Sequence, residues 1–340
     1  MSKKLVYVGF AFDHHKNSEG GYHHIRKYID YDFAVDLQKE REFPGLPEYP
    51  LLSKVIRKIK NVVLGNGLPI GMLRLLYLNL TNKNLVFHFI YPENSYKWLG
   101  KFKRKNNRIA FTLHQPFVFY NNPKWKKIFE ESDLIIVLKK EDVNKFKELT
   151  GSENIFYVPH GINTNYFKPI NKPTIKNRIL MVGNWMRNFE LASNIFVKLR
   201  SLLPDIDIVV VTNKVNFKYF DADNVNLVTS ITNEELLNYY QTSKIVYFPL
   251  DDFTANNALL EAAGCGCHII ISTPMINITE YFPSELIKFT NEDIQTIVDT
   301  LIEILNEEKE CNHKLAKYTQ AQYSWDAVGR SVEKLLSNIS

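Results

Sequence analysis

The sequence predicts an α/β fold that consists of two Rossmann-like, doubly wound domains. Its 340 residues exceed the length at which a single hydrophobic core stops growing, so two domains are expected. Along both halves, short apolar runs alternate with stretches of helical period, which is typical of a buried parallel sheet covered by helices. Between the halves, residues 156–169 (FYVPHGINTNYFKP) combine a strand end, a proline–glycine bend and a second proline, which predicts a hinge.

The first half begins with the pattern of a strand, a glycine loop and a helix. Residues 5–10 are a short apolar run, and the polar, histidine-rich loop that follows ends in Gly20 and Gly21. From Ile25 to Ile29 apolar side chains then repeat at helical spacing. Further buried strands are expected at residues 85–90, 109–113 and 134–138, with a helix at residues 141–149.

The second half repeats this plan. Strands are expected at residues 178–182, 206–211, 226–228, 244–248 and 267–271, and helices at residues 189–203, 233–241 and 255–263. The tail adds two or three helices, of which the last runs from Trp325 to about Ser340. Ser324 is the expected N-cap of that last helix, and Asp326 lies near its start, where a negative charge suits the helix dipole.

Residues 51–80 do not follow the strand and helix rhythm. Lys54, Arg57, Lys58 and Lys60 interleave with apolar residues, and the stretch up to residue 80 is then apolar apart from a single arginine. Such a basic amphipathic segment is typical of an element at a membrane surface, and equally of a core-packing helix with a solvated basic face. Both interpretations stay open. No uncharged apolar run approaches the ~20 residues that are needed to cross a bilayer.

The net charge of +5 is divided unequally between the halves. Residues 1–160 carry 26 Lys and Arg against 16 Asp and Glu, whereas residues 161–340 carry 16 against 21. The basic half predicts attraction to an anionic membrane face or to a phosphate-bearing acceptor, although a basic solvated surface without a partner is an equal alternative. Three cysteines and no export signal indicate a cytoplasmic protein, and Cys265 and Cys267 are expected at a helix C-terminus rather than in a metal site.

Three segments carry a family resemblance: the hinge at residues 156–169, the strand end at 178–183 (RILMVG) and the helix at 258–264 (ALLEAAG). In this order they resemble the nucleotide-sugar half of retaining glycosyltransferases of the GT-B fold, sequence family 4. The resemblance implies two Rossmann-like domains that face a central cleft. These would be an acceptor domain at residues 1–165, a nucleotide-sugar donor domain at 166–322, and a C-terminal helix at 323–340 that crosses back onto the first domain.

The function that this resemblance implies is hexosyl transfer, which belongs to enzyme class 2.4. The donor would be a UDP- or GDP-sugar, and the acceptor a glycan or a polyprenyl-linked lipid, as in the synthesis of bacterial surface polysaccharide. The expected location is the cytoplasm, with a peripheral position at the inner face of the cell membrane as a further expectation. No cofactor, metal ion or nucleic-acid partner is expected.

Holding the donor requires groups that bind a diphosphate and stabilise the charge on the leaving phosphate, which backbone amides and cations can supply without a metal. Gly20 and Gly21 lie where amides can approach a phosphate. Arg187, beyond the first strand of the second domain, has the planar fork that matches phosphate oxygens. Glu261 is a carboxylate in an apolar helix, and the matching glutamate of the family accepts hydrogen bonds from the ribose. His114, in FTLHQP, matches a Thr-x-His pattern of the family whose histidine touches the donor sugar or the reaction centre.

The sequence departs from the family pattern at two places. Phe253 stands where the family has a second glutamate, so either Asp252 or its neighbour substitutes or donor handling is altered, and Asn256 and Asn257 are expected to bond sugar hydroxyls. The lysine that the family places near the arginine is missing. These departures favour, as alternatives, a catalytically silent GT-B module that binds a sugar or a partner, or another GT-B enzyme such as a sugar-nucleotide epimerase.

Four histidines in the first 24 residues are expected to be polar residues of a loop and a helix start near the acceptor side, rather than metal ligands. They are His14, His15, His23 and His24. No glycosidase-like carboxylate pair, nucleophile elbow or Walker loop is present in the sequence, so a covalent nucleophile is not expected.

Overall fold

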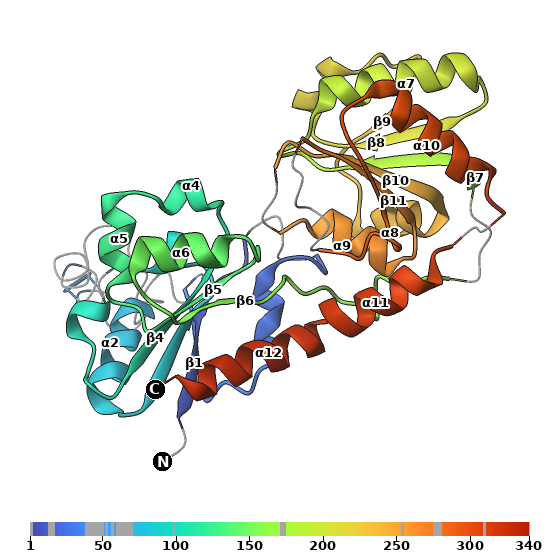
Figure 1. The fold of residues 1–340 in the computed structure, drawn as a ribbon. Helices are drawn as coiled ribbons and strands as arrows, with labels where there is room; N and C mark the ends of the chain where they lie inside the picture. Colours follow the sequence, from blue (N-terminus) through green and yellow to red (C-terminus); the bar gives the residue numbers. More distant parts are fainter. Residues whose placement is uncertain are drawn as a thin grey trace. The chain divides into compact units, whose positions relative to one another are not determined.

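The structure is a computed structural model that describes residues 3–12, 18–37, 51, 54–55, 58, 71–97, 99–170, 175–252, 255–274, 281–308 and 311–339. The chain divides into two compact units: residues 1–161 together with 328–340 form unit 1, and residues 162–327 form unit 2. Each unit contains a six-stranded sheet in which every described strand pair is parallel (Figure 1). The predicted α/β architecture of two doubly wound sheets is confirmed.

The sheet of unit 1 has the strand order β2-β1-β3-β4-β5-β6. Its strands are β1 (Lys4–Gly9), β2 (Phe33–Asp36), β3 (Leu85–Phe89), β4 (Arg108–Leu113), β5 (Leu134–Val137) and β6 (Ile155–Tyr157). Its helices are η2 (Tyr22–Lys27), α2 (Gly71–Thr81), α3 (Pro92–Ser95), η3 (Leu99–Phe102), α4 (Phe117–Tyr120), α5 (Pro123–Phe129) and α6 (Asp142–Thr150). The strand order changes direction between β1 and β3, and ligands of open α/β sheets bind outside the carboxyl ends of strands at such a point.

Side chains of β3 show why the strands of unit 1 appear as continuous apolar runs. Phe87 and Phe89 face the core that packs under α2, α5 and α6, whereas His88 points to the opposite face and is also fully buried. His88 is bonded on both ring nitrogens, to the hydroxyl of Tyr31 at 2.7 Å and to that of Thr112 at 2.8 Å. Burial lowers the pKa of His88 to about 3, so this histidine is a neutral part of the core.

The sheet of unit 2 has the order β12-β11-β10-β7-β8-β9, which is the dinucleotide-binding order with its change of direction between β7 and β10. Its strands are β7 (Ile175–Val182), β8 (Asp207–Val211), β9 (Asn226–Val228), β10 (Ser243–Pro249), β11 (His268–Ser272) and β12 (Lys288–Thr290). Its helices are α7 (Phe189–Leu202), η4 (Lys214–Tyr219), α8 (Asn233–Thr242), α9 (Asn257–Gly264), α10 (Ile294–Asn306) and α11 (His313–Tyr323). α7 and α10 cover one face of the sheet, and α8, α9 and α11 pack into the core on the other (Figure 1).

Polar side chains fix where the helices of unit 2 begin. Asn188, Thr232, Asn256, Asp293 and Asn312 each accept a hydrogen bond from the first turn of the helix that follows. A cap at residue 256 makes α9 start two residues later than the apolar pattern alone predicts. The starts of these helices are therefore set by the cap residue rather than by the first apolar side chain.

The last helix, α12 (Trp325–Asn338), starts in unit 2, and its residues from Val328 onward belong to unit 1. Its expected N-cap, Ser324, accepts a bond from the N–H of Ala327 at 3.3 Å. Just before the helix, the chain pairs with Ile162: the Ile162 N–H donates to the Tyr323 carbonyl at 2.8 Å, and the Trp325 N–H donates to the Ile162 carbonyl at 3.2 Å. The first residue of unit 2 is therefore hydrogen-bonded to the segment at which unit 2 ends.

Much of the predicted basic segment at residues 51–80 lies outside the described residues, apart from four positions and the helix α2. Among the helices that the structure describes, none has both the length and the apolar character that a bilayer crossing requires.

Candidate functional site

The loop after β7 places Arg187 at the carboxyl edge of the unit 2 sheet, where the strand order changes. Gly183 begins this loop with φ +137°, and a Cβ there would lie 2.7–2.9 Å from guanidinium atoms of Arg187. A glycine is therefore required for the guanidinium to lie against the backbone. The loop is held against the segment that follows β10, because Arg187 and Leu250 form an antiparallel bridge.

The guanidinium of Arg187 is held by acceptors but retains an unused donor. Its Nη2 donates to Asn256 Oδ1 at 3.2 Å and its Nη1 to the Trp185 carbonyl at 3.0 Å, and its Cζ lies 5.6 Å from the centre of the Phe248 ring. Its Nε is buried and has no hydrogen-bond partner among the described residues. Burial lowers the pKa of Arg187 to about 10, while Tyr240 and Asp251 oppose this shift, so the side chain is a cation at neutral pH.

Asn256 joins Arg187 to the helix α9. Its Oδ1 accepts from both Arg187 and the N–H of Leu259, the latter at 3.2 Å. Its Nδ2 is buried without a partner among the described residues. The hydrogen bond between Arg187 and Asn256 is thus flanked by two buried N–H groups, one on each residue, that have no acceptor among the described residues. Such a pair is unusual, because leaving a buried donor unpaired costs about 1–3 kcal/mol.

Glu261 lies one turn further along α9, and its side chain is buried against α8. The Tyr240 hydroxyl donates to its Oε2 at 3.1 Å. Burial raises the pKa of Glu261 to about 7, with the Tyr240 bond acting in the opposite direction. Burial and Glu261 in turn raise the pKa of Tyr240 well above its usual value, so this tyrosine remains a donor. The structure thus brings together Arg187, Asn256 and Glu261, and adds Tyr240, for which the sequence holds no signal.

The segment after β10 carries Asp251 and Asp252, and Asp251 is the one that acts electrostatically on Arg187. The N–H of Asp251 donates to the Met186 carbonyl at 3.3 Å, and the Asp251 carboxylate acts on the pKa of Arg187. Burial, followed by the charge of Glu292, raises the pKa of Asp251 itself. The predicted aspartate, Asp252, is half-buried in the same segment, and Phe253 lies outside the described residues. Asn257 is the first residue of α9 and is half-buried.

In unit 1 the predicted glycine loop lies at the carboxyl edge of β1. Gly21 adopts φ +98° and precedes the 3-10 helix η2, which takes the place of the expected α-helix. The next residue, Tyr22, is fully buried, and its N–H donates to the Tyr91 hydroxyl at 2.9 Å. A ring nitrogen of His24 is bonded to the Ser18 carbonyl at 2.9 Å, whereas His14 and His15 lie outside the described residues. Among the residues that are described, no three acidic, histidine or cysteine side chains form a group that could hold a metal ion.

His114 follows β4 and lies in the same aromatic cluster as the glycine loop. Its ring centre is 4.8 Å from that of Tyr22 and 4.5 Å from that of Tyr91, and His160 of the hinge motif is 6.4 Å away. Burial, with a further contribution from His160, holds the pKa of His114 well below its usual range, so its imidazole is neutral. The structure therefore brings Gly21 and His114 close together in one unit.

A carboxylate that the sequence analysis missed supports the His114 loop. Glu93, at the start of α3, accepts the N–H of His114 at 2.7 Å on Oε1, and the same oxygen accepts the Tyr120 hydroxyl. Its Oε2 is buried with no partner among the described residues. Burial raises the pKa of Glu93 to about 7, against the effect of the backbone N–H groups of His114 and Gln115. Glu93 follows a strand closely and lies in a four-residue helix, and no periodic pattern marks such a position.

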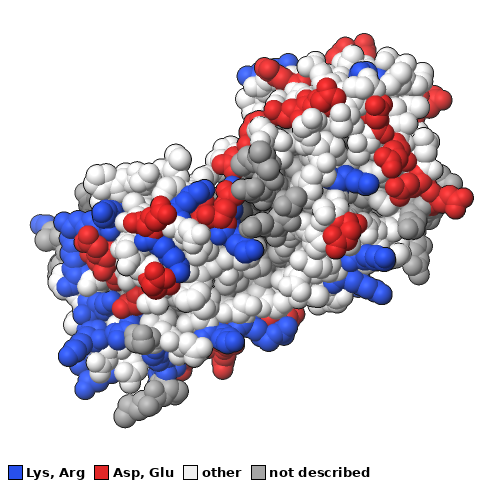
Figure 2. Space-filling view, in the orientation of Figure 1, with Lys and Arg blue, Asp and Glu red and all other residues white. Residues whose placement is uncertain are grey.

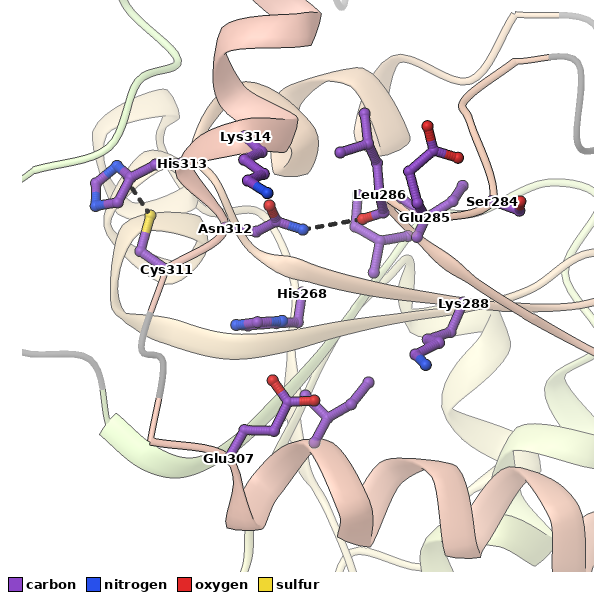
Figure 3. A pocket seen from close by; sticks show the side chains of 13 residues that line it. His268, Ser284, Glu285, Leu286, Lys288, Glu307, Cys311, Asn312, His313 and Lys314 are labelled. Atoms are coloured by element: carbon purple, nitrogen blue, oxygen red, sulfur yellow. Dashed lines mark hydrogen bonds between the residues drawn. The ribbon is translucent and has the colours of Figure 1, made fainter.

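A cavity of about 570 Å³ lies elsewhere in unit 2, at the amino ends of β11 and β12 (Figure 3). His268, Lys288 and Glu307 line it from three elements, and the start of α11 closes one side, where Asn312 Nδ2 donates to the Leu286 carbonyl at 2.9 Å. It contains none of the predicted site residues. Its charged lining includes lysines and glutamates alike, so it offers no net attraction for a nucleotide diphosphate.

No protein-family model matches the chain. One curated relative is the gpi3 subunit of the phosphatidylinositol N-acetylglucosaminyltransferase of Schizosaccharomyces pombe, which is 26% identical over 127 residues. The match covers 36% of this chain and 27% of that protein, so the chain corresponds to about a quarter of the relative's length.

Solved structures of glycosyltransferases are similar to most or nearly all of the chain. The sucrose-phosphate synthase of Thermosynechococcus elongatus is 16% identical with a TM-score of 0.67, and the comparison covers 98% of both chains. A glycosyltransferase of Rickettsia africae is 13% identical with a TM-score of 0.64 over 99% of this chain and 98% of that one. TarM has a TM-score of 0.62 at 13% identity and is matched over 60% of its own length, which is 81% of this chain. The chain therefore has the GT-B fold of glycosyltransferases, as its sequence motifs indicate.

Proposed function

We propose that the protein is a retaining glycosyltransferase that moves a hexose-type sugar from a UDP- or GDP-sugar to a glycan or lipid-linked acceptor. The observation that carries this proposal is the pair Arg187 and Asn256, whose buried Nε and Nδ2 have no partner among the described residues. Both lie at the point of the unit 2 sheet where ligands of this fold class bind. A diphosphate would supply acceptors to both groups, and the cation would balance its charge.

The neighbouring groups fit the rest of a nucleotide. Glu261 is the carboxylate that would accept the ribose hydroxyls, because Tyr240 holds one of its oxygens and fixes the side chain in place. Asn257, Asp251 and Asp252 are then the candidates for the sugar hydroxyls. No step requires a metal ion in this proposal, since Arg187 and backbone N–H groups would stabilise the leaving phosphate.

The proposed transfer needs no covalent intermediate with the protein. The bond between the anomeric carbon and the phosphate oxygen breaks, and the acceptor oxygen forms a new bond to the same face of that carbon. The acceptor proton passes to the leaving phosphate oxygen, which becomes the free nucleoside diphosphate. His114 is neutral and would act in this scheme as a hydrogen-bonding group toward the donor sugar rather than as a proton donor.

The surface of unit 1 supports an acceptor that lies at an anionic membrane. Residues 71–108 contain eight Lys and Arg but one acidic residue, the half-buried Glu93, and basic side chains gather on this unit (Figure 2). Exposed Tyr77, Leu80 and Phe102 lie among them on α2 and η3. The two elements are joined, because Asn79 Nδ2 donates to the Phe102 carbonyl at 2.7 Å. Aromatic and aliphatic groups interleaved with cations suit a membrane surface better than they suit bulk water.

Together with the absence of a spanning helix among the described residues, this surface supports a peripheral position at the cytoplasmic face of the membrane. Synthesis of a bacterial surface polysaccharide is the process in which such an enzyme would work. A polyprenyl-linked acceptor would be presented at that face.

Titration calorimetry with UDP, GDP, UDP-glucose and GDP-mannose tests the proposal. We expect one nucleotide to bind the wild-type protein, and Arg187→Ala to weaken that binding at least ~10-fold, because a charge-assisted bond to phosphate is lost. Arg200→Ala is the matched control, since Arg200 also has a buried Nε without a partner in the described part of unit 2. No binding by the folded wild type would favour the catalytically silent module instead. Conversion of the donor sugar without any acceptor, followed by NMR, would favour the epimerase.

A further inference from the structure

Tyr91 and the first two residues of α3, Pro92 and Glu93, form the junction at which β3 leads into α3, where the strand order of the unit 1 sheet changes. β3 lies between β1, which leads into the glycine loop, and β4, which leads into the His114 loop. Tyr91 is buried and Pro92 is the first residue of α3, where its fixed φ suits the start of a helix. The junction is therefore rigid and lies between the two predicted site loops.

Each side of this junction accepts a backbone N–H from one of the loops. The Tyr91 hydroxyl accepts the N–H of Tyr22, the residue after the glycine pair, at 2.9 Å. Glu93 Oε1 accepts the N–H of His114 at 2.7 Å. The Tyr120 hydroxyl, which donates to Glu93, accepts the next amide, that of Gln115, at 3.2 Å.

Two amides in succession in the His114 loop are thus bonded to a carboxylate and to the hydroxyl that this carboxylate orients. The side chains reinforce the arrangement, because the ring of Tyr91 lies 4.5 Å from that of His114. The Glu93 carboxylate lowers the free energy of unfolding. Its Oε2 is buried without a partner in the described residues, and burial raises the pKa of Glu93 to about 7. A neutral side chain would fill this space at a lower cost in stability.

We propose that Tyr91 and Glu93 are positioning residues that hold the glycine loop and the His114 loop to one rigid junction. The two loops then keep a fixed relation to each other, whichever ligand unit 1 binds. The structural part of this inference stands by itself, and its catalytic consequence rests on the proposed function.

Amide hydrogen exchange of the full chain tests the structural part without any substrate. Glu93→Ala should speed exchange at His114 by at least ~10-fold, the loss expected for a bond to a charged acceptor, and at Gln115 by less, because that amide is bonded to the Tyr120 hydroxyl that Glu93 orients. Tyr91→Phe should speed exchange at Tyr22 by ~2–10-fold. Glu93→Gln keeps the shape and an acceptor, so it should fold and produce a smaller increase at the same two amides. Unchanged exchange at these amides in folded Glu93→Gln and Tyr91→Phe would overturn the proposal.

A second tyrosine–carboxylate pair of unit 1 provides the control. The Tyr96 hydroxyl donates to the Glu131 carboxylate and accepts the N–H of Gly100 at 2.8 Å, away from both loops. Tyr96→Phe and Glu131→Gln should leave exchange at Tyr22 and His114 within ~2-fold of the wild type.

The catalytic consequence is tested by turnover of the donor that calorimetry identifies. Tyr91→Phe and Glu93→Gln should lower kcat while the Kd of the free nucleotide stays unchanged, because the proposed nucleotide contacts belong to unit 2 and His114 would contact only the donor sugar. An equal loss in the control variants would overturn the catalytic role and leave a general effect on stability. If the wild type binds no nucleotide, the proposed function fails, and the exchange measurement still decides on the junction.

Discussion

Replacing Glu261 by glutamine should change stability and ligand affinity in opposite directions. In the folded protein the pKa of Glu261 is raised by burial to about 7 from its usual 4.5. The folded state then binds this proton more tightly than the unfolded state, so the contribution to stability is complete below pH 4.5 and is lost as the pH rises through 7. At 1.36 kcal/mol per unit, the buried carboxylate costs about 3 kcal/mol at pH 8.

Glutamine has nearly the same shape and can still accept the Tyr240 hydroxyl, but it carries no charge to bury. Glu261→Gln should therefore stabilise unit 2 at pH 8 by up to about 3 kcal/mol and approach the wild type near pH 4.5. The same variant should bind the nucleotide donor roughly 10-fold more weakly, because hydrogen bonds from ribose hydroxyls to a neutral acceptor are weaker than those to a carboxylate.

Hydrogen exchange of peptides from α9 and β10 would report the local free energy of unfolding at pH 5, 6, 7 and 8, and calorimetry would report the affinity. Glu190→Gln, at an exposed position of α7, is the control and should change neither quantity. A gain in stability with unchanged affinity would show that Glu261 does not bind ligand. A loss of both would show that its carboxylate supports the fold, which contradicts the argument from burial.

Three further outcomes can be measured. Gly183→Ala should destabilise unit 2 by about 1–3 kcal/mol and weaken nucleotide binding as Arg187→Ala does, because the added methyl group meets the guanidinium at a positive φ; calorimetric melting and nucleotide titration check this. Glu93→Gln should remove the contribution of Glu93 to the pH dependence of unit 1 stability between pH 4.5 and 7, with the variant more stable at the upper end; unchanged dependence would mean that the carboxyl is not desolvated. The protein should sediment with vesicles that contain anionic lipid at low salt and should be released from them as the salt concentration rises. The double substitution Lys101→Gln and Lys105→Gln should lower the sedimented fraction more than the same substitution of both lysines of η4. Equal recovery of the protein with neutral vesicles would contradict a membrane-binding surface. Displacement of the protein from the anionic vesicles by added DNA alone would contradict it as well.

The parts of the fold and site that could be predicted are those whose cause is local in the sequence. Residues 85–90 predict β3 because both faces of that strand are buried, and Glu261 is conspicuous because its neighbours in α9 are apolar. β12, by contrast, has three residues, and α3 has four, which is too short for any period to show.

The residues that were missed depend on partners far away in the chain. Tyr240 is linked to a residue 21 positions later, and Tyr91 to one 69 positions earlier, so only the folded arrangement reveals their roles. The sequence alone does not show whether Asp251 or Asp252 acts electrostatically on Arg187. The answer depends on how the bridge between Arg187 and Leu250 aligns the two loops.

The pairing of Ile162 with the segment around Ser324 has a consequence for the order in which the molecule assembles. Residues 328–340 are synthesised after the whole of unit 2, yet they belong to unit 1, where Gly329 lies so close to the Tyr28 carbonyl that a Cβ would approach it to 2.7 Å. Unit 1 therefore cannot complete its packing until unit 2 has been made. Because the two ends of unit 2 are hydrogen-bonded to each other, folding of unit 2 brings the start of α12 back beside the point where the chain left unit 1. The closure of unit 1 then spans a short gap instead of the full length of residues 162–327, which lowers its entropic cost.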